Sequence, residues 1–216
     1  MNKKKIEDSI KLIQIWYKKY SNQTISTTSC GATSSLLIDL ISKSNCNIPI
    51  IFIDTGFLFE DTIDYYKRLR SLYPNLTFIK LTNNIDKTQY YKIEKNEIQI
   101  LNIEKCCENN KINLLNKFLD ENEIKCWFTA LRRDQNNVRK DMNGVHRNDK
   151  GIYKVLPLLD WSSNEVFEYM EEFNLPYHPL FNLGYNSIGC EPCTKIGNNR
   201  EGRWVNSSKT ECGLHL

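Results

Sequence analysis

Two pairs of cysteines are the residues of this sequence best suited to chemistry. Cys106 and Cys107 are adjacent, and Cys190 and Cys193 form a C-x-x-C pair much further along the chain. Four thiolates are what a tetrahedral zinc site or a [4Fe–4S] cluster requires. Adjacent side chains diverge on a strand or a helix, which is awkward for one zinc ion, so the spacing favours an iron–sulfur cluster. A redox pair at the C-x-x-C motif, with the tandem pair packed in the core, is the alternative.

A further thiol lies close to the end of the sequence, in "KTECGLHL", where Cys212 is followed by His215. Residues near a chain end are usually exposed, and an exposed thiol oxidises readily, so its presence there calls for a function. His215 is close enough in sequence to assist a Cys212 thiolate. The other three cysteines have no partner at metal-binding spacing, and Cys126 lies in an apolar segment typical of a core.

Two turns that follow predicted strands could bind an anion or a nucleotide. Backbone amides and hydroxyls at a helix N-terminus form a phosphate or sulfate site, although ordinary helix capping explains such residues equally well. An Asp-Thr-Gly turn is weakly specific, because it is also a common tight turn, but its aspartate can bind a ribose hydroxyl or a base edge. The candidate ligands are Ser29, Gly31 and Ser34 in "TSCGATSS" and Asp54, Thr55 and Gly56 in "DTGFLFED".

Several basic residues lie near these motifs and could bind an oxyanion. The arginine fork suits sulfate and phosphate because it can bind two oxygens at once. Isolated arginines and lysines are more often solvated surface residues, so the residues alone leave both interpretations open. The candidates are Lys111, Arg132, Arg133, Arg200 and Arg203.

The elements that must position these residues alternate between strands and helices. Such alternation predicts a mostly parallel, twisted α/β sheet with helices on both faces, in which ligands bind at the carboxyl ends of the strands. Residues 84–105 are polar and hard to assign, and the chain from about residue 175 onward reads as loop. We expect strands at 23–27, 48–53, 76–81, 125–131 and 152–158, and helices at 6–20, 36–42, 60–73, 108–120 and 162–173.

Length and charge restrict the class of protein. A chain of 216 residues fits one domain, 1–216, with a mobile tail from about 195 to 216. A net charge of +3, from 29 basic and 26 acidic residues, lacks the dense basic patch of a nucleic-acid binder. The apolar runs are too short to span a bilayer, and no signal peptide is recognisable. We therefore expect a soluble, cytoplasmic protein with no nucleic-acid or membrane partner, and a homo-oligomer is compatible with the sequence.

From about residue 24 to its end, the chain resembles the assimilatory sulfonucleotide reductases, which are the adenylylsulfate and phosphoadenylylsulfate reductases. The segments that carry the resemblance occur in the expected order, and "YNSIGCEPCT" and "KTECGLH" are the most specific. The resemblance implies an adenine nucleotide α-hydrolase-like fold and reductive release of sulfite from an adenylylated sulfate. The other segments include "IPIIFIDTGFLFEDTIDYY", "KCCENNKINLL", "WFTALRRDQNNVR", "LPLLDWSSNEVFEYM" and "REGRW".

The same resemblance assigns roles to the residues. It implies that Cys212 is the nucleophile, that it forms an S-sulfocysteine as AMP leaves, and that thioredoxin or a glutaredoxin-like thiol then releases sulfite. Members of the family with both cysteine pairs carry a [4Fe–4S] cluster and usually use adenylylsulfate, so this substrate is favoured over its 3′-phosphorylated form. By resemblance, the residues that face the phosphate and sulfate groups are Lys111, Arg132, Arg200 and Arg203.

One departure and two further alternatives bear on this assignment. The family usually has two carboxylates in the first turn, where this chain has Thr33 and Ser34. A cluster-bearing ATP pyrophosphatase or tRNA sulfur-transfer enzyme of the same fold would normally have a lysine in that turn, which this chain lacks. The second alternative is a non-catalytic, zinc-binding nucleotide sensor. It would explain the four thiolates but not the presence of Cys212.

Overall fold

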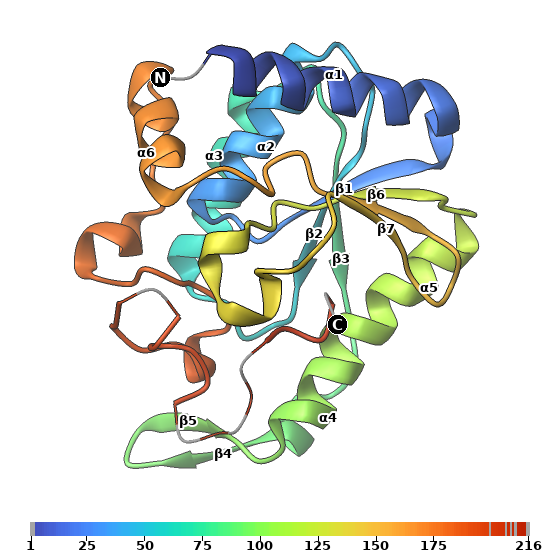
Figure 1. Cartoon of the computed structure of the whole chain (residues 1–216). Coiled ribbons are helices and arrows are strands. Elements are labelled where there is room, and N and C mark those ends of the chain that lie inside the picture. Colours follow the sequence, from blue (N-terminus) through green and yellow to red (C-terminus); the bar gives the residue numbers. More distant parts are fainter. Residues whose placement is uncertain (1–2, 199, 206, 208, 210, 215–216) are drawn as a thin grey trace.

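A six-stranded sheet forms the centre of the computed structural model, which describes residues 3–198, 200–205, 207, 209 and 211–214. The strands lie in the order β3-β2-β1-β6-β8-β7, and every pairing is parallel except that of β7 with β8 (Figure 1). The predicted mostly parallel sheet is therefore confirmed. The strands are β1 (Thr24–Thr28), β2 (Ile50–Asp54), β3 (Phe78–Thr82), β6 (Cys126–Phe128), β7 (Val145–Arg147) and β8 (Tyr153–Val155).

Helices cover both faces of this sheet, as predicted (Figure 1). Alternate residues of β2 serve the two faces: Phe52 packs in one apolar cluster with α1, α2, α3 and α6, whereas Ile51 packs in another with α5. Both faces are apolar, which is why β2 reads as a continuous apolar run. The helices are α1 (Lys3–Tyr20), α2 (Ala32–Lys43), α3 (Glu60–Leu72), α4 (Ile103–Cys107), α5 (Asn113–Glu121) and α6 (Ser163–Glu172).

A β-hairpin occupies the stretch that the sequence left unassigned. Its antiparallel strands, β4 (Tyr91–Glu94) and β5 (Glu97–Ile100), are joined by Lys95 and Asn96, both of which have positive φ. Two residues with positive φ fit the tight turn that two-residue hairpins favour, but the usual Asn-Gly or Asp-Gly signal is missing. The hairpin matters for the site because β5 lies beside the short 3-10 helix Glu191–Cys193.

The C-terminal segment is mostly irregular, as the sequence predicts, with short 3-10 helices at Pro179–Leu183 and Glu191–Cys193. Two of its side chains, Trp204 and Glu211, are nevertheless buried, so the described part of this segment packs against the domain. The mobility of the tail stays a prediction. Among the described residues, no helix is both long and apolar enough to cross a membrane.

His178 has a structural role at the start of the C-terminal segment. Its Nδ1 accepts a hydrogen bond from the Leu180 amide at 3.2 Å, and its Nε2 lies 2.9 Å from the hydroxyl oxygen of Thr62. A neutral ring with Nε2 protonated satisfies both contacts, whereas a second proton on Nδ1 would oppose the Leu180 N–H. Burial accordingly lowers the pKa of His178 to about 4.

Acid should therefore destabilise the fold through His178. As the pH falls from about 6.5 to about 4, the unfolded chain takes up a proton on this ring that the folded chain does not, so the free energy of unfolding should drop by about 2–3 kcal/mol. Urea denaturation at stepped pH values measures this slope. The His178→Gln variant should show a shallower dependence, and identical slopes in the two proteins would contradict the assignment.

Candidate functional site

All four paired cysteines line one cavity, so the two pairs that lie far apart in the sequence come together as predicted. Helix α4 ends at Cys106 and Cys107, and the 3-10 helix Glu191–Cys193 supplies the second pair. The backbone holds the second pair against the turn after β2, because the Glu191 amide donates to the Phe57 carbonyl at 2.7 Å. The cavity therefore lies beside the edge of the sheet at which β2 ends.

Polar groups contact the cysteine sulfurs inside this cavity. The hydroxyl oxygen of Thr55 is 3.2 Å from the Cys190 sulfur, and the Asn110 amide nitrogen is 3.7 Å from the sulfur of Cys106. Asn110 also donates to the Cys106 carbonyl at 3.1 Å and is itself buried. The sequence did not single out Asn110, although a buried asparagine one turn after Cys106 fits a residue that orients a ligand.

The donor set in this cavity fits an iron–sulfur cluster. Burial raises the pKa of Cys106 to about 11 and that of Cys193 to about 12, with the neighbouring Cys190 sulfur contributing to both. Four soft thiol donors surrounded by apolar side chains such as Phe57 and Ile103 are the environment that such clusters take. Within the described residues, no three or more His, Cys, Asp or Glu side chains are yet grouped closely enough to hold a metal ion.

Cys212 and Lys111 form a second contact at the rim of the same cavity. The Lys111 ammonium nitrogen lies 4.0 Å from the Cys212 sulfur, and Lys111 also lines the cavity. The lysine is carried by a π-helical turn, Glu108–Ile112, that follows α4 directly, and such turns often occur at functional sites. Burial opposes the charge on Lys111, but the sulfurs of Cys212, Cys190 and Cys107 more than offset it and raise its pKa. A cation therefore lies beside the Cys212 sulfur.

Arg200 and Arg203 both lie against the ring of Trp204 in the C-terminal segment, and their role toward phosphate and sulfate groups stays a prediction. Their guanidinium groups are 5.4 and 4.4 Å from the ring centre of the buried Trp204. Arg203 donates to the Ile188 carbonyl at 3.2 Å and passes so close to Gly189 that a Cβ there would lie 2.3 Å from it. Arg200 donates to the Glu211 carboxylate at 3.1 Å.

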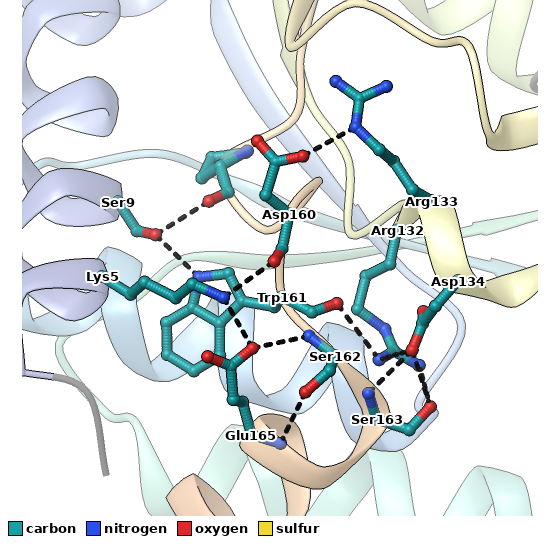
Figure 2. Close-up of polar contacts among 11 residues, drawn as sticks. Lys5, Ser9, Arg132, Arg133, Asp134, Asp160, Trp161, Ser162, Ser163 and Glu165 are labelled. Carbon is teal, nitrogen blue, oxygen red and sulfur yellow. Dashed lines mark hydrogen bonds and ion pairs between the residues drawn. The ribbon is translucent and has the colours of Figure 1, made fainter.

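Arg132 contacts residues at the start of α6 (Figure 2). It is buried, and its guanidinium group is 3.1 Å from both the Asp134 carboxylate and the Ser163 hydroxyl. Asp134 in turn accepts from the Ser163 amide at 2.8 Å, so the pair joins the loop after β6 to the start of α6. The role of Arg132 toward phosphate and sulfate groups stays a prediction, and the neighbouring Arg133 binds Asp160.

The two candidate turns lie at the same edge of the sheet, because β1 and β2 are parallel neighbours. In the first turn the hydroxyl of Ser34 donates back to the Gly31 carbonyl at 2.8 Å, the N-cap residue Gly31 makes no side-chain cap, and Ser29 is exposed. In the second turn, Asp54 accepts from the Gly56 amide at 3.0 Å, and Gly56 has positive φ, as in a tight turn. Their nucleotide-binding roles stay predictions.

Two residues that the sequence did not single out, Arg139 and Glu211, form a buried ion pair beside Cys212. Arg139 donates to both oxygens of the Glu211 carboxylate, at 2.8 and 2.6 Å. Burial opposes the charge on Glu211, but these contacts and the Cys212 amide hold its pKa at about 2. Glu211 directly precedes the candidate nucleophile, which is the signal that could have identified it. His215, considered above as a helper of Cys212, lies outside the described residues.

Two solved structures are examples of proteins that share this fold. The phosphoadenylyl-sulfate reductase of Candida auris superposes with a TM-score of 0.70, at 23% identity, over 85% of this chain and 88% of that one. The FMN adenylyltransferase of Candida glabrata superposes with a TM-score of 0.69, at 15% identity, over 90% of this chain and 65% of that one. These likenesses confirm the predicted adenine nucleotide α-hydrolase-like fold.

Sequence comparison with curated proteins identifies the family. The adenosine 5′-phosphosulfate reductase of Lysinibacillus sphaericus is 36% identical over 212 residues, which are 96% of this chain and 90% of the relative. The protein of the same name in Halalkalibacterium halodurans is 36% identical over 214 residues, which are 97% and 92% of the two chains. Residues 23–196 match the model of the phosphoadenosine phosphosulfate reductase domain. The chain therefore belongs to the phosphoadenosine phosphosulfate reductase domain family.

Proposed function

We propose that this protein reduces adenylylsulfate to sulfite and AMP in sulfate assimilation, with Cys212 as the nucleophile. The observation that carries the proposal is the contact between the Cys212 sulfur and the Lys111 ammonium group, 4.0 Å apart, at the rim of the cavity that the four paired cysteines line. The names of the curated relatives, which are adenosine 5′-phosphosulfate reductases, support the same substrate.

In the first step the Cys212 thiolate attacks the sulfur of the sulfate group. A bond forms between the two sulfur atoms as the bond from the sulfate sulfur to the bridging oxygen breaks, and AMP leaves with that oxygen. The Lys111 cation favours the thiolate before the attack, because it lies beside the Cys212 sulfur. Arg200 and Arg203 carry forks that can bind the sulfate and phosphate oxygens and so fix the angle of attack.

In the second step a separate dithiol protein of the thioredoxin or glutaredoxin type releases the product. One of its thiolates attacks the Cys212 sulfur, sulfite leaves, and a mixed disulfide forms. The second thiol of the reductant then resolves this disulfide and restores the Cys212 thiol. The two electrons that convert the sulfate sulfur to sulfite therefore come from oxidation of the dithiol to a disulfide. Reducing chemistry of this kind, together with thiols kept reduced, suits a cytoplasmic location.

The four cysteines of the cavity, Cys106, Cys107, Cys190 and Cys193, would hold a [4Fe–4S] cluster. When bound, the cluster would join α4 to the 3-10 helix Glu191–Cys193 and fix the wall of the site next to Lys111. Thr55 and Asn110, which contact two of the sulfurs, would orient the ligands. Thr55 thereby links the turn after β2, a candidate nucleotide site, to the cysteines.

Sulfite release from two nucleotides tests the proposed function. Enzyme purified without oxygen, with thioredoxin as reductant, should form sulfite and AMP from adenylylsulfate. With the 3′-phosphorylated nucleotide, kcat/KM should be lower by a factor of about ten or more, because one unmatched charged group typically costs at least 1.4 kcal/mol. A preference for the 3′-phosphorylated nucleotide would contradict the proposed substrate. If neither nucleotide yields sulfite, the proposed reaction is wrong.

A further inference from the structure

We propose that Glu211 is a positioning residue, whose carboxylate is anchored by Arg139 so that the next residue, Cys212, lies against Lys111. This inference rests on the proposed role of Cys212 as the nucleophile. The resemblance to the reductases assigned roles to Cys212 and to four basic residues but none to this ion pair.

The geometry of the pair is that of an anchor between two segments far apart in the sequence. Arg139 donates through Nε to Oε2 of Glu211 at 2.8 Å and through an Nη atom to Oε1 at 2.6 Å. The side chains are only 5% and 4% exposed. Asn136 adds a third hydrogen bond to the carboxylate at 2.9 Å and also caps the short 3-10 helix Asn137–Arg139. A two-pronged contact of this kind fixes orientation as well as distance.

The carboxylate acts on Cys212 directly through the backbone. The amide of Cys212 donates to Oε1 of Glu211 at 2.8 Å, so the orientation of the peptide that carries the thiol depends on where the carboxylate is held. The residues that follow are held by other elements: Gly213 lies against Ile112, and the Leu214 carbonyl accepts from Lys154 at 3.1 Å. Without the anchor, these contacts alone would have to set the position of the thiol.

A buried pair of this kind suits positioning better than stabilisation. The desolvation of two charges offsets most of their attraction, so the pair adds little net stability, but its geometry is strongly enforced because either charge alone in that place is costly. Arg200 also donates to Oε1 of Glu211, at 3.1 Å. Glu211 therefore holds one of the arginines proposed to bind the sulfonucleotide and the nucleophile in a fixed relation to each other.

The test compares Glu211→Gln, which preserves the shape of the side chain, with Arg139→Met and a matched control. Single-turnover AMP release from adenylylsulfate should slow by about 30-fold or more in both variants, which corresponds to about 2 kcal/mol for breaking a buried charge pair. The dissociation constant for adenylylsulfate should change by a smaller factor than this rate does, although the contact of Glu211 with Arg200 links it to the proposed binding site. Glu201→Gln removes an exposed carboxylate of the same segment and should react at the wild-type rate.

A second measurement reports tail position without any catalysis. Iodoacetamide labelling of Cys212 in the nucleotide-free enzyme, followed by peptide mass, should be faster in Glu211→Gln and Arg139→Met than in wild type and Glu201→Gln. In the double variant, Cys212 should be labelled no faster than in the single variant with the faster labelling, because the two residues act as one unit. Wild-type AMP release, or wild-type labelling, in Glu211→Gln would overturn the positioning role. If Cys212 is not the nucleophile, Cys212→Ser will still release sulfite, whereas the labelling rates of the Glu211 and Arg139 variants will not change.

Discussion

Replacing Cys212 by serine is expected to abolish sulfite release while leaving nucleotide binding and any bound cluster intact. A serine hydroxyl provides almost no anion at neutral pH, so the Lys111 cation, 4.0 Å from the sulfur in the native protein, would have no thiolate to stabilise. We expect turnover with adenylylsulfate and thioredoxin to fall by a factor on the order of 10³ or more. Binding of AMP, measured by calorimetry, should change little.

Wild-type enzyme without reductant provides the complementary result. It should release about one AMP per active site and then stall, with one SO₃ group added to the peptide that contains Cys212. Other cysteines in the same protein serve as the control, because they should stay unmodified. Cys30 is fully buried, and burial raises its pKa and that of Cys126 to about 12. Added mass on either of these cysteines, or turnover by Cys212→Ser, would show that the proposed mechanism is wrong.

The regular elements of the fold could be predicted because hydrophobic periodicity determines them locally. Strand β2 is apolar on both faces, and α6 begins with the capping box that Ser162 and Glu165 form, so both are recognisable from neighbouring residues. The β4–β5 hairpin was not predicted, because its turn residues, Lys95 and Asn96, lack the glycine that usually marks positive φ. Its strands, YKIE and EIQI, do alternate apolar and polar residues, but each has only four residues and is largely exposed.

The parts of the site that consist of short sequence motifs could be predicted. Contacts between residues that only the tertiary structure brings together could not. The four paired cysteines and Cys212 are identifiable from spacing and resemblance, and the structure brings them to one cavity and its rim. The pairing of Arg139 with Glu211 depends on how the C-terminal segment returns to the loop after β6, which no local pattern indicates.

Arg132 shows how partners that are distant in the sequence set the direction of a side chain. Its motif suggested a role at the anion site, but Asp134 and Ser163 lie close enough to engage its fork, so the side chain points to the start of α6 (Figure 2). Two adjacent arginines also point in different directions, because Arg133 turns toward Asp160. The direction of an arginine after a strand is therefore decided by partners that the sequence alone does not place.

Serine at any one of the four cavity cysteines should cause loss of the cluster. Wild-type protein purified without oxygen should be brown and contain iron and labile sulfide in equal amounts, because a [4Fe–4S] cluster holds four of each. A hydroxyl is a harder and weaker donor than a thiolate, so each variant should bind much less iron and lose the visible absorption. Iron and sulfide analysis measures both. The variants are Cys106→Ser, Cys107→Ser, Cys190→Ser and Cys193→Ser.

Cys46→Ser is the matched control, because Cys46 is also buried but lies in the apolar cluster on the α1, α2, α3 and α6 face of the sheet, away from the cavity. It should keep its iron and its activity. Wild-type protein that is colourless, loaded with zinc and fully active would overturn the cluster. If the cluster is present, its loss should also slow sulfite release while Cys212 remains intact, because Cys107 and Cys190 lie close enough to Lys111 to influence its charge. Without the cluster, α4 and the 3-10 helix Glu191–Cys193 would no longer be linked, so the position of Lys111 beside Cys212 would be less fixed.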